Sequence, residues 1–256
     1  MNLATQLQGV VVAWQVYGLT HDPLSLGLIG LAEALPFIGF ALPAGHLADR
    51  VSRLRIVRLA LMALLLCSVA LLAFTIWPGI VHPGRVWPIY LVIFCSGIAR
   101  SFLQPSRTAL SAEVVPRSLF ANAVTWRSST WQLAAVLGPA LGGLIYGFGD
   151  AMSAYMVDVA LMLVGLLAIA QISHTPKKAP ATDESVVESL AGGVRFVRGQ
   201  PVLLGALTLD LFSVLFGGAT ALLPVFAAEI LHVGPQGLGL LRAAPAAGAV
   251  VMSLLL

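Results

Sequence analysis

Eight stretches of this sequence are apolar enough and long enough to cross a lipid bilayer as helices, because a bilayer core needs about 20 predominantly apolar residues per helix. They are residues 3–19, 24–46, 56–76, 87–106, 126–147, 151–172, 201–228 and 236–256. Of the 256 residues, 59% are hydrophobic and only 10% are charged. A soluble core of this size cannot bury that much apolar surface. The sequence therefore predicts an all-α, polytopic membrane protein.

Basic residues alternate between the connections that join these spans. The second, fourth and sixth connections, counted with the adjoining helix ends, have four Lys or Arg each, and the others have one or none. Cytoplasmic loops of membrane proteins are enriched in Lys and Arg. This alternation predicts that both termini lie in the cytoplasm. It also accounts for the basic pI without nucleic acid as a partner.

Residues 173–200 form the only long polar segment. Its first half, with Pro176 and Pro180, has the composition of a linker. Its second half spaces apolar residues at helical intervals, which favours an amphipathic helix at the cytoplasmic surface; a simple tether is the alternative. The sequence thus divides into a six-helix bundle (1–172, with a short first helix), a cytoplasmic linker (173–200) and an incomplete second bundle (201–256).

The connection between the second and third spans reads GHLADRVSRLR, residues 45–55. It resembles the loop signature G-x-L-A-D-R-x-G-R-R/K of the major facilitator superfamily in residue type, spacing and place. Ser52 stands where that family usually has glycine, and Leu54 where a basic residue is common. The matching residues are Gly45, Leu47, Asp49, Arg50 and Arg53.

A second pattern lies in the fifth span, where residues 138–143 read GPALGG. Gly and Pro in a membrane helix allow close helix approach and a kink, so ordinary small-residue packing is one interpretation. The segment also resembles the helix 5 motif of antiporters in the same superfamily, with Gly138, Pro139, Gly142 and Gly143 at the motif positions. Nearly the whole chain is similar to the branch of bacterial efflux proteins that contains the enterobactin exporter.

The resemblance implies two six-helix halves with a substrate cavity between them. This chain would then be an incomplete twelve-helix fold, truncated at both ends; a natural half-transporter with a companion subunit is the alternative. The implied function is a proton-coupled secondary transporter of the cell inner membrane. It would export a small hydrophobic or amphiphilic molecule (a drug, siderophore or metabolite) by alternating access. The alternative function is a non-transporting membrane module that needs a partner, and no catalytic motif suggests an enzyme.

The resemblance also assigns a role to the charged loop. Asp49 would work with Arg53 and with Arg100 or Arg107 at the end of the fourth span as a cytoplasmic latch that stabilises the outward-open state. In relatives the latch includes the eleventh span, which these residues do not contain.

Ionisable residues inside apolar spans are functional candidates, because each costs roughly 2.5–3.5 kcal/mol on insertion scales. Glu33, Asp158 and Asp210 are candidates for proton coupling, and Glu33 comes first as a single carboxylate in GLIGLAEALPFIG. Structural hydrogen bonding is the alternative for Glu33 and Asp158. Asp210 is also a possible ion-pair partner for Arg242, which could instead attract an anionic substrate.

Polar and aromatic residues of the first span complete the candidate site. Trp14, Gln15 and Tyr17 could line the cavity together with Arg242, although the two aromatic residues fit packing equally well. The histidines show no metal-ligand spacing, so no metal or cofactor is predicted. The predicted partners are the lipid bilayer, a small-molecule substrate and protons.

Overall fold

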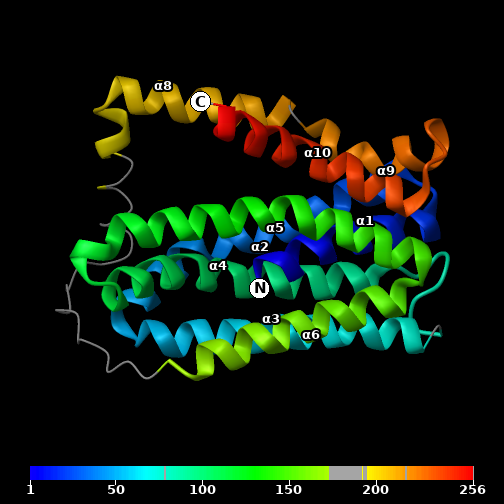
Figure 1. Cartoon of the computed structure of the whole chain (residues 1–256), viewed down its shortest axis with the longest axis horizontal. Coiled ribbons are helices and arrows are strands. Elements are labelled where there is room, and N and C mark those ends of the chain that lie inside the picture. Colours follow the sequence, from blue (N-terminus) through cyan, green and yellow to red (C-terminus); the bar gives the residue numbers. More distant parts are fainter. Residues whose placement is uncertain (78, 173–191, 193–194, 217, 256) are drawn as a thin grey trace.

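The computed structural model describes all residues except 78, 173–191, 193, 194, 217 and 256. Long helices run side by side along the molecule (Figure 1). Apart from one isolated bridge between His82 and Arg85, every regular element of the described residues is a helix, which confirms the all-α fold. The first six helices are α1 (Asn2–Thr20), α2 (Pro23–Arg50), α3 (Arg53–Ile76), α4 (Trp87–Val114), α5 (Phe120–Phe148, preceded by the short η1, Arg117–Leu119) and α6 (Ala151–Ala170).

The predicted seventh span is not one continuous helix. It consists of α8 (Pro201–Phe216), the 3₁₀ turn η2 (Gly218–Leu222), α9 (Leu223–Val225) and the π-helical turn η3 (Phe226–Ile230). Gly218 and Pro224 explain much of this interruption, because glycine weakens a helix and proline lacks a backbone donor. The eighth span is α10 (Gly234–Leu255). The predicted amphipathic helix falls largely outside the described residues.

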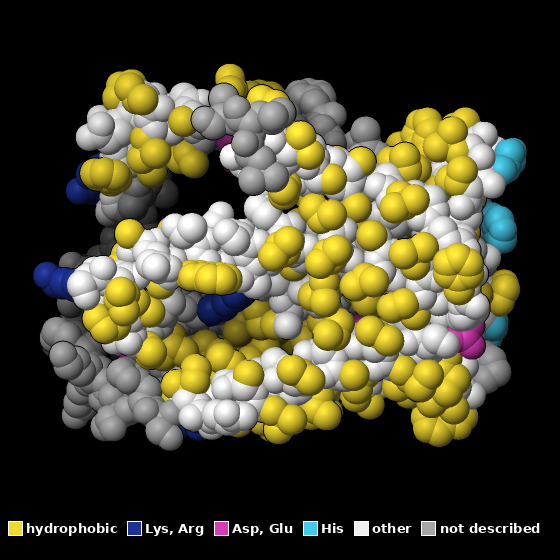
Figure 2. Space-filling model, in the orientation of Figure 1, with side chains coloured by type: hydrophobic (Ala, Val, Ile, Leu, Met, Phe, Trp, Pro, Cys, Tyr) yellow, Lys and Arg dark blue, Asp and Glu magenta, His cyan; other side chains and the backbone are white. Residues whose placement is uncertain are grey.

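Four helices in the described parts of the chain meet both the length and the apolarity required to span a membrane: Pro23–Ala41, Arg53–Ile76, Arg117–Phe148 and Ala151–Ala170. Large apolar side chains on these helices point outward, for example Ile38 (70% exposed), Leu66 (66%) and Val164 (64%). Figure 2 shows hydrophobic side chains over most of the visible face. Such a surface is stable only against lipid.

The two ends of the helical array differ in charge. Histidines lie at one end of the visible face and most Lys and Arg side chains toward the other (Figure 2). At the histidine end, the carboxylates of Asp22 and Asp150 accept hydrogen bonds from Leu24 N (3.0 Å) and Ser153 N (2.7 Å) and begin α2 and α6. The Ser153 backbone N–H lowers the pKa of Asp150 because it stabilises the charged form.

The core of the first six helices is built around α1. Leu7, Val11 and Val16 of α1 are fully buried and pack with Tyr155 of α6 and Ile89 of α4 in one apolar cluster. A second cluster joins α3, α4 and α6. Because α1 is buried on several sides, its orientation is fixed. Its side chains outside this apolar cluster include those that face the candidate site.

One arginine closes the basic end of α6. Arg58 of α3 donates from Nη2 to the carbonyl oxygens of Ala170 (3.1 Å) and Ile172 (2.8 Å). They lie at the C-terminal end of α6, where the carbonyl oxygens have no N–H donors from the helix itself. We expect Arg58→Ala to lower the free energy of unfolding by about 1 kcal/mol. Thermal unfolding in detergent measures this, with Arg55→Ala as control because Arg55 is exposed on the same helix. Equal stability of the two variants would show that this cap contributes nothing.

Candidate substrate-binding cavity

A cavity of about 570 Å³ lies between the first six helices and the segment from η2 to α10. Its volume is in the range of sites for drug-sized molecules. On α1 the lining residues Thr5, Gln8, Gly9 and Val12 follow helical spacing, so they share one face. The other walls come from α2, α4 and α5 and from the helices that follow the linker (α8 to α10), which are called the second unit below. They include Leu26, Ile29, Glu33, Ile93, Arg100, Pro139, Leu223 and Arg242.

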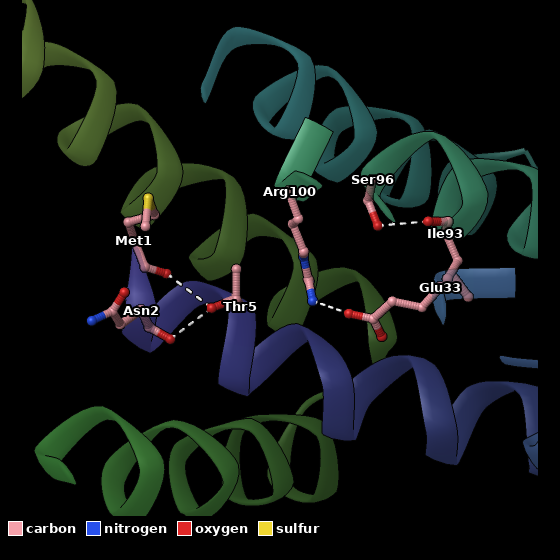
Figure 3. A network of polar contacts seen from close by, with 7 residues as sticks. All are labelled: Met1, Asn2, Thr5, Glu33, Ile93, Ser96 and Arg100. Carbon is pink, nitrogen blue, oxygen red and sulfur yellow. Dashed lines mark hydrogen bonds and ion pairs between the residues drawn. The ribbon is translucent and has the colours of Figure 1, made fainter. Parts of the chain in front are cut away.

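An ion pair stands in the cavity wall. Arg100 reaches from α4 toward the carboxylate of Glu33 on α2, close to Thr5 of α1 (Figure 3). Nη1 of Arg100 donates to Oε1 of Glu33, and the side chains keep 25% and 42% of their exposure. Glu33 is therefore not the isolated carboxylate that its apolar surroundings in the sequence indicated. Arg100 was predicted to join the cytoplasmic loop motif, and the structure instead places it in the cavity, because α4 continues well beyond it to Val114.

Arg242 of α10 enters the same cavity from the second unit. Its Nη1 lies 3.6 Å from the point where a Cβ on Gly9 of α1 would be, so the guanidinium rests against the backbone of α1. Glu33 is the carboxylate whose charge acts on Arg242. The possible pair with Asp210 is not formed, since Asp210 is exposed on α8.

Behind the cavity wall lies a buried polar cluster that links α1, α3 and α6. Gln8 lines the cavity, and its Nε2 donates to Asp158 Oδ2 (2.8 Å) and lies 3.1 Å from Ser68 Oγ. Asp158 and Ser68 are fully buried. The second carboxylate oxygen of Asp158 has no hydrogen-bond partner within the described chain. Asp158 is thus held by uncharged groups, one residue away from the cavity.

The three α1 residues predicted to line the cavity have other contacts. Tyr17 is buried and donates to Glu229 of η3, and Gln15 accepts from the Tyr155 hydroxyl at 2.6 Å. Trp14 packs against an apolar cluster that joins α1 to the second unit. These residues lie on the faces of α1 that turn toward α6 and the second unit. The cavity-lining positions are Thr5, Gln6, Gln8, Gly9, Val12 and Ala13.

The loop motif lies at the junction of α2 and α3. Gly45, Leu47, Asp49 and Arg50 belong to the last turns of α2, whose final residue is Arg50; the side chains of Asp49 and Arg50 are outside the description. Ser52 has φ −58°, a value open to any residue, so glycine is not required there.

Motif arginines contact groups on α1 and α4. Arg53 Nη1 donates to Glu113 Oε1 at 2.6 Å, and Arg107 donates to Asn2 Oδ1 at 2.8 Å. Arg53 and Glu113 thus form a charged cluster beside the loop motif, although nothing in the sequence around Glu113 indicated this contact.

The glycines of α5 mark two close helix crossings. A Cβ on Gly138 would lie 2.5 Å from Gln6 Cβ, and one on Gly142 would lie 2.9 Å from Leu7 O, both on α1. A Cβ on Gly143 would lie 2.3 Å from Pro235 O and 2.8 Å from Gly239 Cα, beside α10. Real Cβ atoms do not approach so closely. The GPALGG segment therefore fixes α1 on one side and the second unit on the other.

Comparison with known proteins agrees with this architecture. The whole chain, residues 1–256, matches the family described as Transmembrane secretion effector, a major facilitator family. The chain belongs to this family. It is thus a multi-pass membrane protein, and its described helices form an incomplete major facilitator fold.

Three curated relatives illustrate the range of similarity. Enterobactin exporter EntS of Shigella flexneri is 28% identical over 204 residues, which are 79% of this chain and 48% of EntS. EntS of Citrobacter koseri is 26% identical over 249 residues, 97% of this chain and 58% of EntS. The MFS-type transporter YfiS of Bacillus subtilis is 26% identical over 224 residues, 83% of this chain and 51% of YfiS. The chain spans about half the length of the curated relatives it matches.

Proposed function

We propose that this major facilitator protein is a secondary active exporter of a small amphiphilic molecule, which binds in the cavity between the two helical units. The observation that carries the proposal is the cavity itself, with mostly apolar walls that include one ion pair. Apolar walls with a few convergent polar groups are typical of small-molecule sites. The printed names of the EntS relatives, which are exporters, support the direction of transport.

Alternating access is the mechanism that we propose. The crossing of α5 and α10 at Gly143 and Gly239 joins the two units beside Pro139 of the cavity wall. The molecule is hollowed between α5 and α8 (Figure 2). Rocking of one unit about such a crossing would expose the cavity first to one side and then to the other. The charged cluster around Arg53 and Glu113 would act as a latch.

Proton influx is the proposed energy source, and Glu33 is the coupling carboxylate. Glu33 faces the cavity, so it can exchange protons with water there, and Arg100 provides a partner that its protonation would release. We assign Asp158 a structural role, because its contacts are the uncharged Gln8 and Ser68. Asp210 on the exposed surface of α8 remains the weakest candidate.

The charge distribution supports an orientation in the cell inner membrane. The arginine-rich ends of the helices would face the cytoplasm, and the end with Asp22, Asp150 and the histidines would face outward. Both termini would then be cytoplasmic. The activity that we propose is transport without a chemical reaction.

A flux assay tests the proposed function. The purified protein is reconstituted into liposomes, a pH gradient is imposed, and accumulation of two related dyes, rhodamine 123 and carboxyfluorescein, is followed. We expect gradient-dependent accumulation of at least one dye, abolished by a protonophore. Folded protein that moves neither dye alone, but gains flux with a companion half-transporter, would favour the non-transporting module instead.

The structural role of Asp158 predicts a difference between two substitutions. Asp158→Ala leaves one buried N–H of the Gln8 amide without an acceptor, while the other still contacts Ser68. We therefore expect a loss of about 1–3 kcal/mol in the free energy of unfolding. Asp158→Asn keeps an acceptor oxygen and should retain both stability and flux. Thermal unfolding and the dye assay measure the two effects. Folded Asp158→Asn protein without flux would transfer proton coupling from Glu33 to Asp158.

A further inference from the structure

The cavity has more positive than negative charge. Its lining includes two guanidinium groups, Arg100 and Arg242, and one carboxylate, Glu33. Glu33 and Arg100 form an ion pair and neutralise each other. Arg242 makes no hydrogen bond or ion pair with any residue that the structure describes; only the more distant charge of Glu33 acts on it. Within the described part of the chain, one cation at the cavity wall therefore lacks a hydrogen-bond or ion-pair partner.

A partly buried guanidinium without a partner is costly, because it has lost hydration and five N–H donors remain to be satisfied. The backbone of Gly9 lies beside it and offers no counter-charge. A carboxylate, sulfonate or phosphate can accept two parallel hydrogen bonds from this fork. The rest of such a ligand would contact apolar side chains from both units, such as Val12, Ile29 and Leu223.

We propose that the molecule transported through this cavity is an anionic amphiphile, and that Arg242 binds its negatively charged group. The inference rests on the proposed transport function for its biological role, and it names the class of substrate. An anion that leaves the cytoplasm is also driven outward by an inside-negative membrane potential.

Binding of two matched fluorescent probes tests this assignment without any transport. The probes are 8-anilinonaphthalene-1-sulfonate, an anion, and N-phenyl-1-naphthylamine, its neutral counterpart without the sulfonate. Both are titrated into the protein in phosphatidylcholine nanodiscs, with the signal of empty nanodiscs subtracted. We expect the wild-type protein to bind the anion more tightly than the neutral probe.

The variants should change anion affinity in opposite directions. Arg242→Gln should weaken binding of the anion about 10-fold and leave the neutral probe nearly unchanged, since only a charge-assisted contact is lost. Glu33→Gln should strengthen anion binding, because it removes the carboxylate that balances Arg100. Arg242→Lys should restore part of the affinity, and Arg198→Gln, an exposed arginine outside the cavity, should have no effect.

Three results would overturn the inference. The first is an unchanged affinity for the anionic probe in Arg242→Gln. The second is an equal loss of affinity for both probes in folded Arg242→Gln protein, which would mean that Arg242 only shapes the cavity. If Arg242→Gln does not fold, Arg242→Lys and Glu33→Gln still decide by the sign of their effects. The third result is displacement of the anionic probe by added phosphatidylglycerol, which would identify a lipid instead of a soluble substrate as the ligand. Binding as expected without any flux would contradict the transport function alone.

Discussion

Glu33→Gln should reduce gradient-driven dye flux at least about 10-fold, the largest functional effect that we expect from a single substitution. The change removes the proposed proton site and leaves Arg100 without its counter-ion in the cavity wall. Breaking an ion pair on one side is more damaging than removing both charges, because the remaining charge is left uncompensated. Arg100→Gln should therefore also impair flux, although it retains the carboxylate.

The double variant separates the contributions of the pair and the proton. In Glu33→Gln/Arg100→Gln, the stability of the folded protein should recover, since no uncompensated charge remains from the pair. Flux driven by the pH gradient should stay low, because the proposed proton carrier is missing. Thermal unfolding measures the stability, and the reconstituted dye assay, run with and without a pH gradient, measures the flux. Full gradient-driven flux in the double variant would remove Glu33 from the coupling mechanism.

Gly239→Ala should cause the largest loss of stability among small substitutions in α10. A Cβ at this position would lie 2.5 Å from Pro139 O and 3.0 Å from Gly143 Cα, so α5 and α10 would have to separate. Overpacking of this kind costs about 1–3 kcal/mol, and we expect a decrease in Tm of about 5 °C. Flux should fall as well, because the two units would no longer meet at the crossing about which they rock.

The same helix provides a matched control. A Cβ on Gly248 would meet no atom within 4 Å, so Gly248→Ala should stabilise α10 by up to about 1 kcal/mol through helix propensity alone. The two alanine substitutions thus have opposite expected signs in a thermal unfolding experiment. A similar effect of both would mean that the close approach of α5 and α10 is unimportant for stability.

Some features of this protein follow from local physical chemistry and can be predicted from sequence. Lipid requires long apolar helices, so the bounds of α1 to α6 were predictable within several residues. The glycines of GPALGG predicted close packing because only a missing side chain permits it. The interruption between α8 and α10 was harder to predict, since apolar composition alone does not distinguish one helix from several short ones.

The partners of the polar side chains depended on tertiary structure. Glu33 and Arg100 are 67 residues apart in the chain, and no local pattern indicates that they meet. Gln8 is one of several polar residues in the first apolar span, and nothing in its sequence context distinguishes it, yet it joins the cavity wall to Asp158. Sequence periodicity could show which residues share a face of α1, but not which face turns toward the cavity.

The sequence by itself therefore determined the helical membrane class, the family and the charge asymmetry of the two ends, because each depends on composition and spacing along one helix or loop. The tertiary structure alone decided which charges neutralise each other. Packing brought α2 and α4 together around the Glu33–Arg100 pair. It left Arg242 of α10 facing the same cavity without an ion-pair partner among the residues that the structure describes. That arrangement arises from contacts between distant segments, which no spacing along the chain can specify.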